Sequence, residues 1–427
     1  MGHTRRVFLF LLIALFSAPA WAQGPAPAAA QDWPQWGGPN RNFTSSATGL
    51  LSAWPSGGPR VAWNRDLGEG YSAIVAEGNR VYTMYREKAG FLSIGKQDQE
   101  VVVALDAATG KTLWEYRYDA EKLPRMQLEY GPGPHATPLI VGNRIFAVGA
   151  MGHFHTLDKN TGRALWSHDL NKEFGVLWGR GYSCSPIAYK DTVILATGKK
   201  THSVIAFRQS DGAVAWKRHD FDYGPSSPIL INVDGQEQLV LFMAEGPVGL
   251  DPATGDLFWS HPHKTDWGLN ISTPVWGEGN LLFLSSAYSG GSRVLHLTRK
   301  DGKTIVRELW FSSRLRIHFG TAIRLGEFVY GSSGDFGPAF LTAVNIKTGQ
   351  VAWQDRSFSR ASLVYADGKV IVLDEDGQLA LARVSPTGLQ VLARADVLTR
   401  NAWTPPTLAG TRLFIRDRKT IRRIDLK

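Results

Sequence analysis

The stretch VALDAATGKTLW, residues 103–114, decides the fold because it recurs along the chain. Alternating apolar residues before Asp106 predict a β-strand. Asp106 to Gly110 predict a tight turn, in which the Asp side chain bonds to the turn backbone and Gly supplies a positive φ. The next strand ends in Trp114, whose flat indole can pack between neighbouring sheets. Further copies end at Trp166, Trp259 and Trp353, and divergent copies run from Ile205 to Trp216, Leu295 to Trp310 and Leu381 to Leu392.

Two markers recur along the chain. The turn glycines repeat with a mean spacing of about 46 residues, a period typical of propellers and repeat arrays. They are Gly110, Gly162, Gly212, Gly255, Gly302, Gly349 and Gly388. Upstream of each, a Ser or Thr, often followed by Pro, starts an apolar strand that leads into a hairpin. These starts are Ser72, Thr137, Ser185, Ser227, Thr273, Thr321, Ser362 and Thr404.

Each unit therefore comprises four antiparallel strands, which is a blade of a β-propeller. The last unit, from Thr404 to Lys427, is too short for a whole blade. A spare strand at Arg60–Leu67 carries Trp63 where a blade's last strand carries its tryptophan. We predict an all-β, eight-bladed propeller over residues 60–427, with few helices. The N-terminal strand joins the C-terminal blade and closes the ring, which leaves no free edge there.

The repeat A-L-D-x-x-T-G-x-x-x-W resembles the repeat of pyrroloquinoline quinone (PQQ)-like propellers, and the resemblance covers residues 60–427. It implies the eight-bladed fold. That family includes quinoprotein alcohol dehydrogenases and a non-enzymatic lipoprotein of the machine that assembles outer-membrane proteins, so the resemblance leaves the activity open. Residues 33–41, WPQWGGPNR, resemble a lead-in found on an exported bacterial subgroup without assigned function.

The first 22 residues are typical of a signal peptide. Arg5 and Arg6 precede the apolar run 7–16, and a small-residue site predicts cleavage before Gln23. The run is too short to span a membrane, and no later stretch is long and apolar enough. We expect an exported, periplasmic protein that uses either the Sec or the twin-arginine route. Residues 23–59 are expected to form a Pro/Ala linker followed by the lead-in.

The net charge and the cysteine content limit the kinds of partner, disulfide and metal cluster that the protein can have. Removal of the signal peptide lowers the formal net charge from +9 to +7, because Arg5 and Arg6 leave with it. No Lys/Arg block is present, so we expect no nucleic-acid partner. The lone Cys184 excludes an internal disulfide framework and multi-cysteine metal clusters, and we expect it to be a small buried core residue. It also excludes the adjacent-cysteine disulfide that the resemblance implies for the alcohol dehydrogenases. We expect a monomer.

The loops before the innermost strands are the candidate site. Propeller geometry places these loops at one mouth of the central channel, opposite the Asp-x-x-Thr-Gly turns, and functional groups concentrate on such loops. They are rich in aromatic, His and Arg side chains, which suit a planar or anionic small ligand or a protein partner. The predicted contact residues are Tyr71, His135, Trp178, Arg180, Tyr182, Tyr223, Trp267, Asn270, His318, Arg360 and Trp403.

These residues predict an exported scaffold that binds a ligand or a protein and lacks a complete catalytic set. One alternative is a PQQ- and Ca²⁺-dependent dehydrogenase of alcohols or sugars, in which Arg180 and Arg360 would pair the carboxylates of the cofactor. The mouth and nearby-loop candidates for its calcium ligands and base are Glu129, Glu173, Asn270 and Asp335. A second alternative is a scaffold in outer-membrane protein assembly. The missing lipidation cysteine argues against its membrane attachment.

Other metal candidates are weaker, and we assign no metal ligands. His153 and His155 alternate on a strand, share a face and could ligate a metal with His135, but strand histidines are more often structural. His261 and His263 flank a proline in a loop. Residues 374–377, DEDG, resemble a fragment of a calcium loop but lack its spaced ligands, so we expect an acidic turn there.

Overall fold

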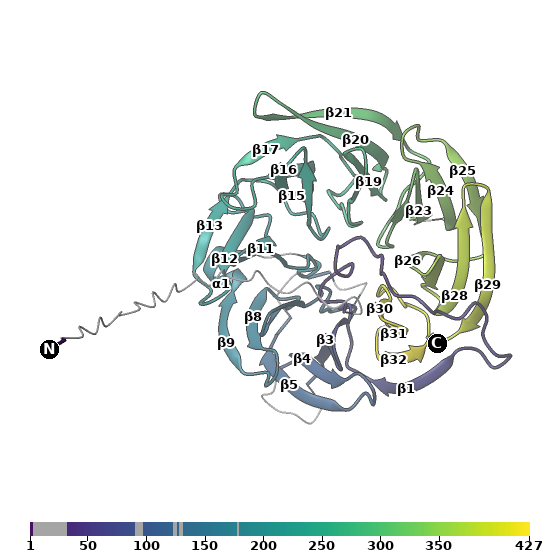
Figure 1. Cartoon of the computed structure of the whole chain (residues 1–427), viewed down its shortest axis with the longest axis horizontal. Helices are drawn as coiled ribbons and strands as arrows, with labels where there is room; N and C mark the ends of the chain where they lie inside the picture. The colour runs from purple at the N-terminus through teal and green to yellow at the C-terminus, as the bar shows by residue number, and fades with distance from the viewer. Residues whose placement is uncertain (3–31, 90–96, 123–125, 128–130, 177–178, 336) are drawn as a thin grey trace.

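The computed structural model describes residues 1–2, 32–89, 97–122, 126–127, 131–176, 179–335 and 337–427. Eight four-stranded antiparallel sheets form a ring (Figure 1), which confirms the predicted eight-bladed propeller. Within these ranges the only α-helix is α1 (Leu170–Phe174). No helix of this described part is long and apolar enough to cross a membrane. The predicted signal peptide lies outside the described residues apart from its first two positions.

The first four blades run from an innermost to an outermost strand in chain order. They are β2 (Val75–Glu77), β3 (Arg80–Glu87), β4 (Gln99–Asp106) and β5 (Thr112–Asp119); β6 (Leu139–Val141), β7 (Arg144–Val148), β8 (His153–Asp158) and β9 (Ala164–Asp169); β10 (Ile187–Tyr189), β11 (Thr192–Ala196), β12 (Val204–Arg208) and β13 (Val214–Arg218); and β14 (Ile229–Val233), β15 (Gln236–Met243), β16 (Gly246–Leu250) and β17 (Leu257–Ser260).

The next three blades keep the same order, and the eighth combines the two ends of the chain. They are β18 (Val275–Gly277), β19 (Leu281–Ser286), β20 (Gly291–Lys300) and β21 (Lys303–Ser312); β22 (Ile323–Leu325), β23 (Phe328–Ser333), β24 (Phe340–Asn345) and β25 (Val351–Asp355); β26 (Ala361–Ala366), β27 (Lys369–Asp374), β28 (Gln378–Ser385) and β29 (Gly388–Asp396); and β30 (Thr407–Ala409), β31 (Arg412–Arg416), β32 (Thr420–Asp425) and β1 (Arg60–Asp66).

Strand β1 closes the ring as predicted. It pairs antiparallel with β32, from Arg60 opposite Asp425 to Asp66 opposite Thr420. The N-terminal strand is therefore the outermost strand of the C-terminal blade. The backbone of β32 is thus paired on both sides, with β31 and with β1.

The repeat tryptophans join each blade to the next. In five of seven cases the indole covers the turn glycine of the following blade so closely that a Cβ at this glycine would lie only 2.6–2.8 Å from the ring. The pairs are Trp63 with Gly110, Trp114 with Gly162, Trp166 with Gly212, Trp216 with Gly255, and Trp310 with Gly349. In four of these five pairs the indole N–H also donates a hydrogen bond to the next blade, as from Trp114 to the carbonyl of Lys159 at 3.0 Å, whereas the buried Nε1 of Trp216 does not. The recurring glycine therefore serves packing as well as turn geometry.

The Asp of the repeat holds the turn itself together. Asp106 Oδ1 accepts hydrogen bonds from the backbone N–H of Ala108 and of Thr109 and from the Thr109 hydroxyl, at 2.8–3.0 Å. These bonds lower the pKa of Asp106 below its usual range. Asp158 makes the same contacts with its own turn. The Asp-x-x-Thr-Gly pattern is thus a self-contained turn that presents its glycine to the preceding blade.

The Ser/Thr marker has an inter-blade role at the channel wall. The Ser185 hydroxyl accepts the N–H of Thr137 at 3.0 Å, and the Ser227 hydroxyl accepts the N–H of Ser185 at 3.0 Å. The Thr137 hydroxyl in turn accepts the N–H of Ala73 at 3.3 Å. We call these hydroxyls of Thr137, Ser185 and Ser227 the hydroxyl belt. They satisfy backbone groups that the short innermost strands leave without a ladder partner.

The lead-in crosses the central channel from the face that carries the turns. Trp33 forms an antiparallel bridge with Ala76 in β2, and Thr44 forms a parallel bridge with Tyr365 in β26. Between these bridges, Trp36 Nε1 donates to Thr273 Oγ1 at 2.8 Å. The segment before β1 is visible across the middle of the ring in Figure 1. Residues 33–44 thus contact blades on opposite sides of the ring and cover this end of the channel.

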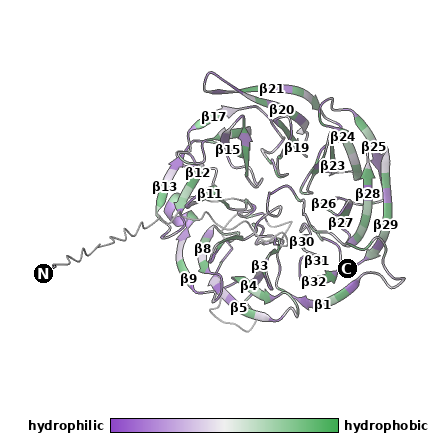
Figure 2. Ribbon diagram, viewed as in Figure 1, coloured by the Kyte–Doolittle hydropathy of each residue, from purple (hydrophilic) through white to green (hydrophobic). Residues whose placement is uncertain are grey.

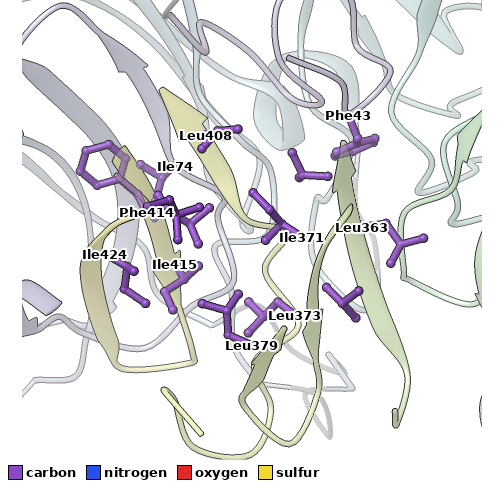
Figure 3. Packing of buried hydrophobic residues seen from close by; sticks show 14 of the residues in the cluster. Phe43, Ile74, Leu363, Ile371, Leu373, Leu379, Leu408, Phe414, Ile415 and Ile424 are labelled. Carbon is purple, nitrogen blue, oxygen red and sulfur yellow. The ribbon is translucent and has the colours of Figure 1, made fainter. Parts of the chain in front are cut away.

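The hydrophobic core lies within and between the blades. Strand β4 is buried at all its central positions, whereas the outermost strand β5 alternates with exposed residues, and Figure 2 shows hydrophilic residues interrupting the outer strands. The largest cluster joins blades 6, 7, 8 and 1 to the lead-in. Phe43 of the lead-in is 2% exposed and belongs to the same cluster as Leu363 of β26; both are labelled in Figure 3. The lead-in is therefore part of the core.

The tryptophan–glycine contact predicts a difference between two turn glycines. Gly162 has a φ of +72° and faces Trp114, whereas Gly302 has a φ of +76° and no atom near its would-be Cβ. Gly302→Ala should cost about 1 kcal/mol for the backbone conformation alone. Gly162→Ala adds overpacking and should cost about 2–4 kcal/mol in all. Urea unfolding followed by tryptophan fluorescence measures both, and equal losses would contradict the packing role.

Candidate binding face

Aromatic side chains from four loops stack side by side on the mouth face, which we define as the face bearing the loops before the innermost strands. The ring of Tyr71, before β2, is parallel to that of His135, before β6, with centroids 5.8 Å apart and an interplanar angle of 8°. On its other side Tyr71 stacks on Trp403, before β30, at 5.1 Å. Trp403 in turn contacts Phe319, before β22, at 5.1 Å. Blades at the two ends of the chain thus contribute to one surface.

The row continues through blades 6 and 5. His318 meets Tyr288, in the loop between β19 and β20, with centroids 4.9 Å apart, and the Tyr288 hydroxyl lies 2.5 Å from His318 Nε2. Trp267 packs edge-on against Tyr288 at 4.8 Å and is 59% exposed. We call the row from His135 through Tyr71, Trp403, Phe319, His318 and Tyr288 to Trp267 the aromatic arc.

An ion pair fixes the middle of the arc. Arg360 lies over the ring of Phe319 at 5.3 Å and donates two hydrogen bonds to Glu375, at 3.0 and 2.9 Å. Arg360 Nη1 also donates to the carbonyl of Asp335 at 3.1 Å. Trp403 Nε1 donates to Glu375 Oε2 at 3.0 Å. The planar fork of Arg360 is therefore engaged by protein groups, and it aligns the rings on both sides.

The two histidines of the arc are neutral at pH 7. Burial lowers the pKa of His135 to about 4. Burial, aided by the nearby charge of Arg360, lowers the pKa of His318 to about 4. Both rings therefore present a neutral, largely apolar surface at physiological pH.

The structure separates the predicted contact residues into three groups. Tyr71, His135, Trp267, His318, Arg360 and Trp403 belong to the arc or support it. Three others are buried and support the backbone. Tyr182 donates to the carbonyl of Ala196 at 2.6 Å, and the Tyr223 hydroxyl accepts the N–H groups of Ser183 and Cys184. Asn270 is 0% exposed and donates to backbone carbonyls. Arg180 donates to Gln127 at 3.2 Å, and Trp178 lies outside the described residues.

Sequence reasoning missed Tyr288 and Phe319. Tyr288 lies in the loop between the second and third strands of its blade, a position that also opens on the mouth face. Phe319 directly follows the predicted His318. A search of the loops between second and third strands for aromatic residues would have found Tyr288, but nothing in the local sequence distinguishes the side chain of Phe319 from a core residue.

An open pocket of about 530 Å³ lies between blades 6 and 7. Its wall includes Ser359 and Asp374, the sequence neighbours of Arg360 and Glu375, but no residue of the arc. Arg356 and Arg394, also in its wall, stack on Phe340 and Phe358 at 4.7 and 4.6 Å. The other residues that line it are Pro338, Ala339, Ser357, Phe358, Asp376, Gln378 and Asp396.

The described residues do not fit PQQ with a calcium ion. Among the candidates for calcium ligands and base, Glu173 bonds to His168 and caps the N-terminus of α1. Asn270 donates to buried backbone carbonyls. Asp335 accepts a hydrogen bond from the backbone N–H of Tyr288, and its carboxylate lies 3.5 Å from the guanidinium of Arg316. Glu129 lies outside the described part. Arg360 is committed to Glu375, so it is not poised to pair a carboxylate of the cofactor. These side chains do not converge on one point, and we derive no reaction through this cofactor.

The weaker metal candidates are engaged in packing. His155 is 6% exposed and its ring lies 4.2 Å from that of Tyr118, while His263 accepts a hydrogen bond from Arg293 at 2.8 Å. Asp374 accepts backbone N–H groups of Asp376 and Gln378 in the β27–β28 turn, as an acidic turn would. Cys184 is fully buried, as predicted. Over the described ranges, no three His, Cys, Asp or Glu side chains are grouped so that they could hold a metal ion.

The fold and repeat define an eight-bladed propeller of the PQQ-like class. The family model described as outer membrane protein assembly factor BamB matches residues 19–129 and 97–355, and the chain belongs to this family. Outer membrane protein assembly factor BamB of Yersinia pestis is 24% identical over 297 residues, covering 65% of this chain and 70% of that protein. Polyvinylalcohol dehydrogenase of Sphingopyxis sp. is 27% identical over 365 residues, covering 74% of this chain but only 51% of that relative.

Solved structures show the same fold. BamB from Moraxella catarrhalis superposes with a TM-score of 0.60 and 18% identity, covering 86% of this chain and 99% of that one. Quinohemoprotein alcohol dehydrogenase from Comamonas testosteroni superposes with a TM-score of 0.52 and 13% identity, covering 94% and 81%. At these identities the likenesses establish the architecture and leave the activity open.

The lowered pKa of His318 predicts a loss of stability in acid. With a pKa of about 4 in the folded protein and about 6.5 in the unfolded chain, the unfolded state binds more protons between these values, so stability falls as the pH drops from about 6.5 to 4. His318→Gln removes this contribution. Its unfolding free energy should depend less steeply on pH, by up to about 1.4 kcal/mol per pH unit. Urea unfolding between pH 4.5 and 7 measures the slopes, and identical slopes would contradict the assignment.

Proposed function

We propose that this protein is a non-catalytic scaffold of the bacterial cell envelope that binds a partner protein through the aromatic arc of its mouth face. The observation that carries the proposal is the exposed indole of Trp267 at the end of a row of pre-stacked rings. Tryptophan, tyrosine and arginine dominate the binding energy of protein interfaces. Because the arc is already ordered by mutual contacts, its side chains would lose little further conformational entropy when a partner binds.

Membership of the BamB family supports a role in outer-membrane protein assembly for this scaffold. The predicted signal peptide, which would export the chain to the periplasm, is consistent with that role. No observation favours the dehydrogenase alternative. Arg360, which would pair a carboxylate of PQQ in that alternative, is bonded to Glu375 instead. The described candidates for calcium ligands and base are dispersed.

Site-specific photocrosslinking at Trp267 tests the proposal. The full chain is expressed in its host with a photoreactive phenylalanine at position 267, and with the same group at Leu113 as a control, which is 46% exposed but lies on the outermost strand β5. Position 267 should give a discrete crosslinked protein, identified by mass spectrometry as a component of outer-membrane protein assembly, and position 113 should not. Equal products at both positions, or none at 267, would overturn the proposed face.

A binding measurement with the identified partner tests the energetics. Trp267→Ala should weaken affinity about 30-fold, because an aromatic hot-spot residue contributes about 2 kcal/mol. Its melting temperature should change little, since the side chain is mostly exposed.

The scaffold interpretation itself is tested separately. Titration of the purified protein with PQQ and CaCl₂ should leave the absorption spectrum of PQQ unchanged and give no dye reduction with alcohols or sugars, and reduction would overturn it.

A further inference from the structure

Arg41 is a buried cation that protein groups satisfy only in part. It lies in the lead-in where this segment crosses the channel, and it is 5% exposed. Its Nη1 atom donates to Gln35 Oε1 at 3.2 Å and to the carbonyl of Pro186 at 3.1 Å. The Nε and Nη2 atoms are buried and make no hydrogen bond with the described protein groups. Over those same residues, no carboxylate lies within ion-pair distance of Arg41.

Arg416 shows how the same fold satisfies a buried arginine. It is 0% exposed, and burial lowers its pKa to about 10, as it does for Arg41. In Arg416, however, Nε, Nη1 and Nη2 all donate hydrogen bonds. The acceptors are the carbonyls of Asp417, Ser72, Met84 and Gly70 and the hydroxyl of Thr83, at 2.8–3.3 Å. Arg416 is thus a structural arginine, and Arg41 differs from it by two unpaired nitrogen atoms.

The charge of Arg41 is also uncompensated. With a pKa of about 10 the guanidinium stays protonated at pH 7. The ionisable group that acts on it is Cys184, whose pKa burial raises to about 12, so that its thiol is neutral at pH 7. A buried charge without a counter-charge and with unpaired donors costs several kcal/mol. A small anion would relieve both costs at once.

The channel wall next to Arg41 carries further donors. Ser185 lies between Cys184 and Pro186, the residues that Arg41 approaches, and belongs to the hydroxyl belt. The three belt oxygens accept backbone N–H groups of the neighbouring blades. Each hydroxyl retains its own hydrogen, because a hydroxyl accepts and donates independently. Guanidinium N–H donors on the lead-in and hydroxyl O–H donors on the adjoining channel wall, with no carboxylate paired to the guanidinium, are the chemistry of an anion site.

We propose that the channel binds one small inorganic anion, chloride or an oxyanion such as phosphate, at Nε and Nη2 of Arg41 beside the hydroxyl belt. The anion supplies the counter-charge of Arg41. It thereby stabilises the docked lead-in, since Arg41 belongs to that segment and bonds to blade 3. The site lies on the lead-in and is independent of the aromatic arc. A result against the anion site would therefore leave the proposed function unaffected, and the reverse also holds.

Thermal unfolding of the full mature chain tests the site. Sodium chloride and sodium phosphate are titrated separately against sodium gluconate at constant ionic strength, because gluconate is too bulky for a closed site. The melting temperature of the wild type should rise saturably, by at least about 2 °C, with one or both small anions. Arg41→Gln should abolish the rise. Trp36→Phe is the matched control: it removes a lead-in hydrogen bond but no anion ligand, so it should lower the melting temperature and keep the rise.

A second readout needs no variant. Wild-type crystals soaked in sodium bromide should show an anomalous peak within about 3.5 Å of the Arg41 guanidinium. If chloride raises the melting temperature and bromide gives a peak, the bound anion is a halide. If only phosphate raises the melting temperature, the bound anion is an oxyanion. An equal rise in wild type and Arg41→Gln, or the absence of any saturable rise together with an ordered water at this position, would overturn the proposal.

Discussion

The contact on which the ring depends is the indole of one blade lying flat on the turn glycine of the next. A side chain at that glycine would collide with the ring at 2.6–2.8 Å, and the same glycine has a positive φ that its turn requires. The Asp side chain holds the turn rigid so that it can receive the indole. One residue pattern therefore specifies the local turn and the blade-to-blade contact together, which is the consistency across levels that favours a single fold.

Two of the seven junctions that carry a repeat tryptophan depart from this contact, and they show what the contact requires. Gly302 and Gly388 have no neighbouring atoms at their would-be Cβ. Gly302 lies at the end of the long β20–β21 hairpin, whose turn extends beyond the reach of Trp259, and Trp259 Nε1 bonds instead to Gln238 of its own blade at 2.7 Å. Trp353 keeps its hydrogen bond to the next blade, at the carbonyl of Ser385. The junction thus tolerates loss of the glycine contact where long strands supply other packing.

The sequence pattern predicts the blades because each blade is built from local signals that repeat. Closure by Arg60–Leu67 was also predictable, since Trp63 marks the strand. The candidate site was predictable only as a set of loops. Position before an innermost strand does not reveal what a side chain contacts. Tyr182, Tyr223 and Asn270 therefore appear equivalent to Tyr71 in sequence, although their polar atoms bond to backbone groups, whereas the ring of Tyr71, itself only 9% exposed, stacks on His135 and Trp403. The docking of the lead-in was not predictable, because Arg41 meets Pro186 across 145 residues without any repeated pattern.

The docked lead-in determines which part of the molecule can meet a partner. It covers the channel from the turn side with Trp33, Trp36 and Phe43, all anchored to blades on different sides of the ring. The lead-in therefore occupies that end of the channel, whereas the loops before the innermost strands form the mouth face at the other end. There the polar atoms of Arg360, Glu375 and Trp403 are bonded to one another, and the exposed ring of the arc is the indole of Trp267, whereas Tyr71 and Tyr288 are buried. A surface of this kind suits the burial of an apolar partner side chain better than the positioning of a substrate for chemistry.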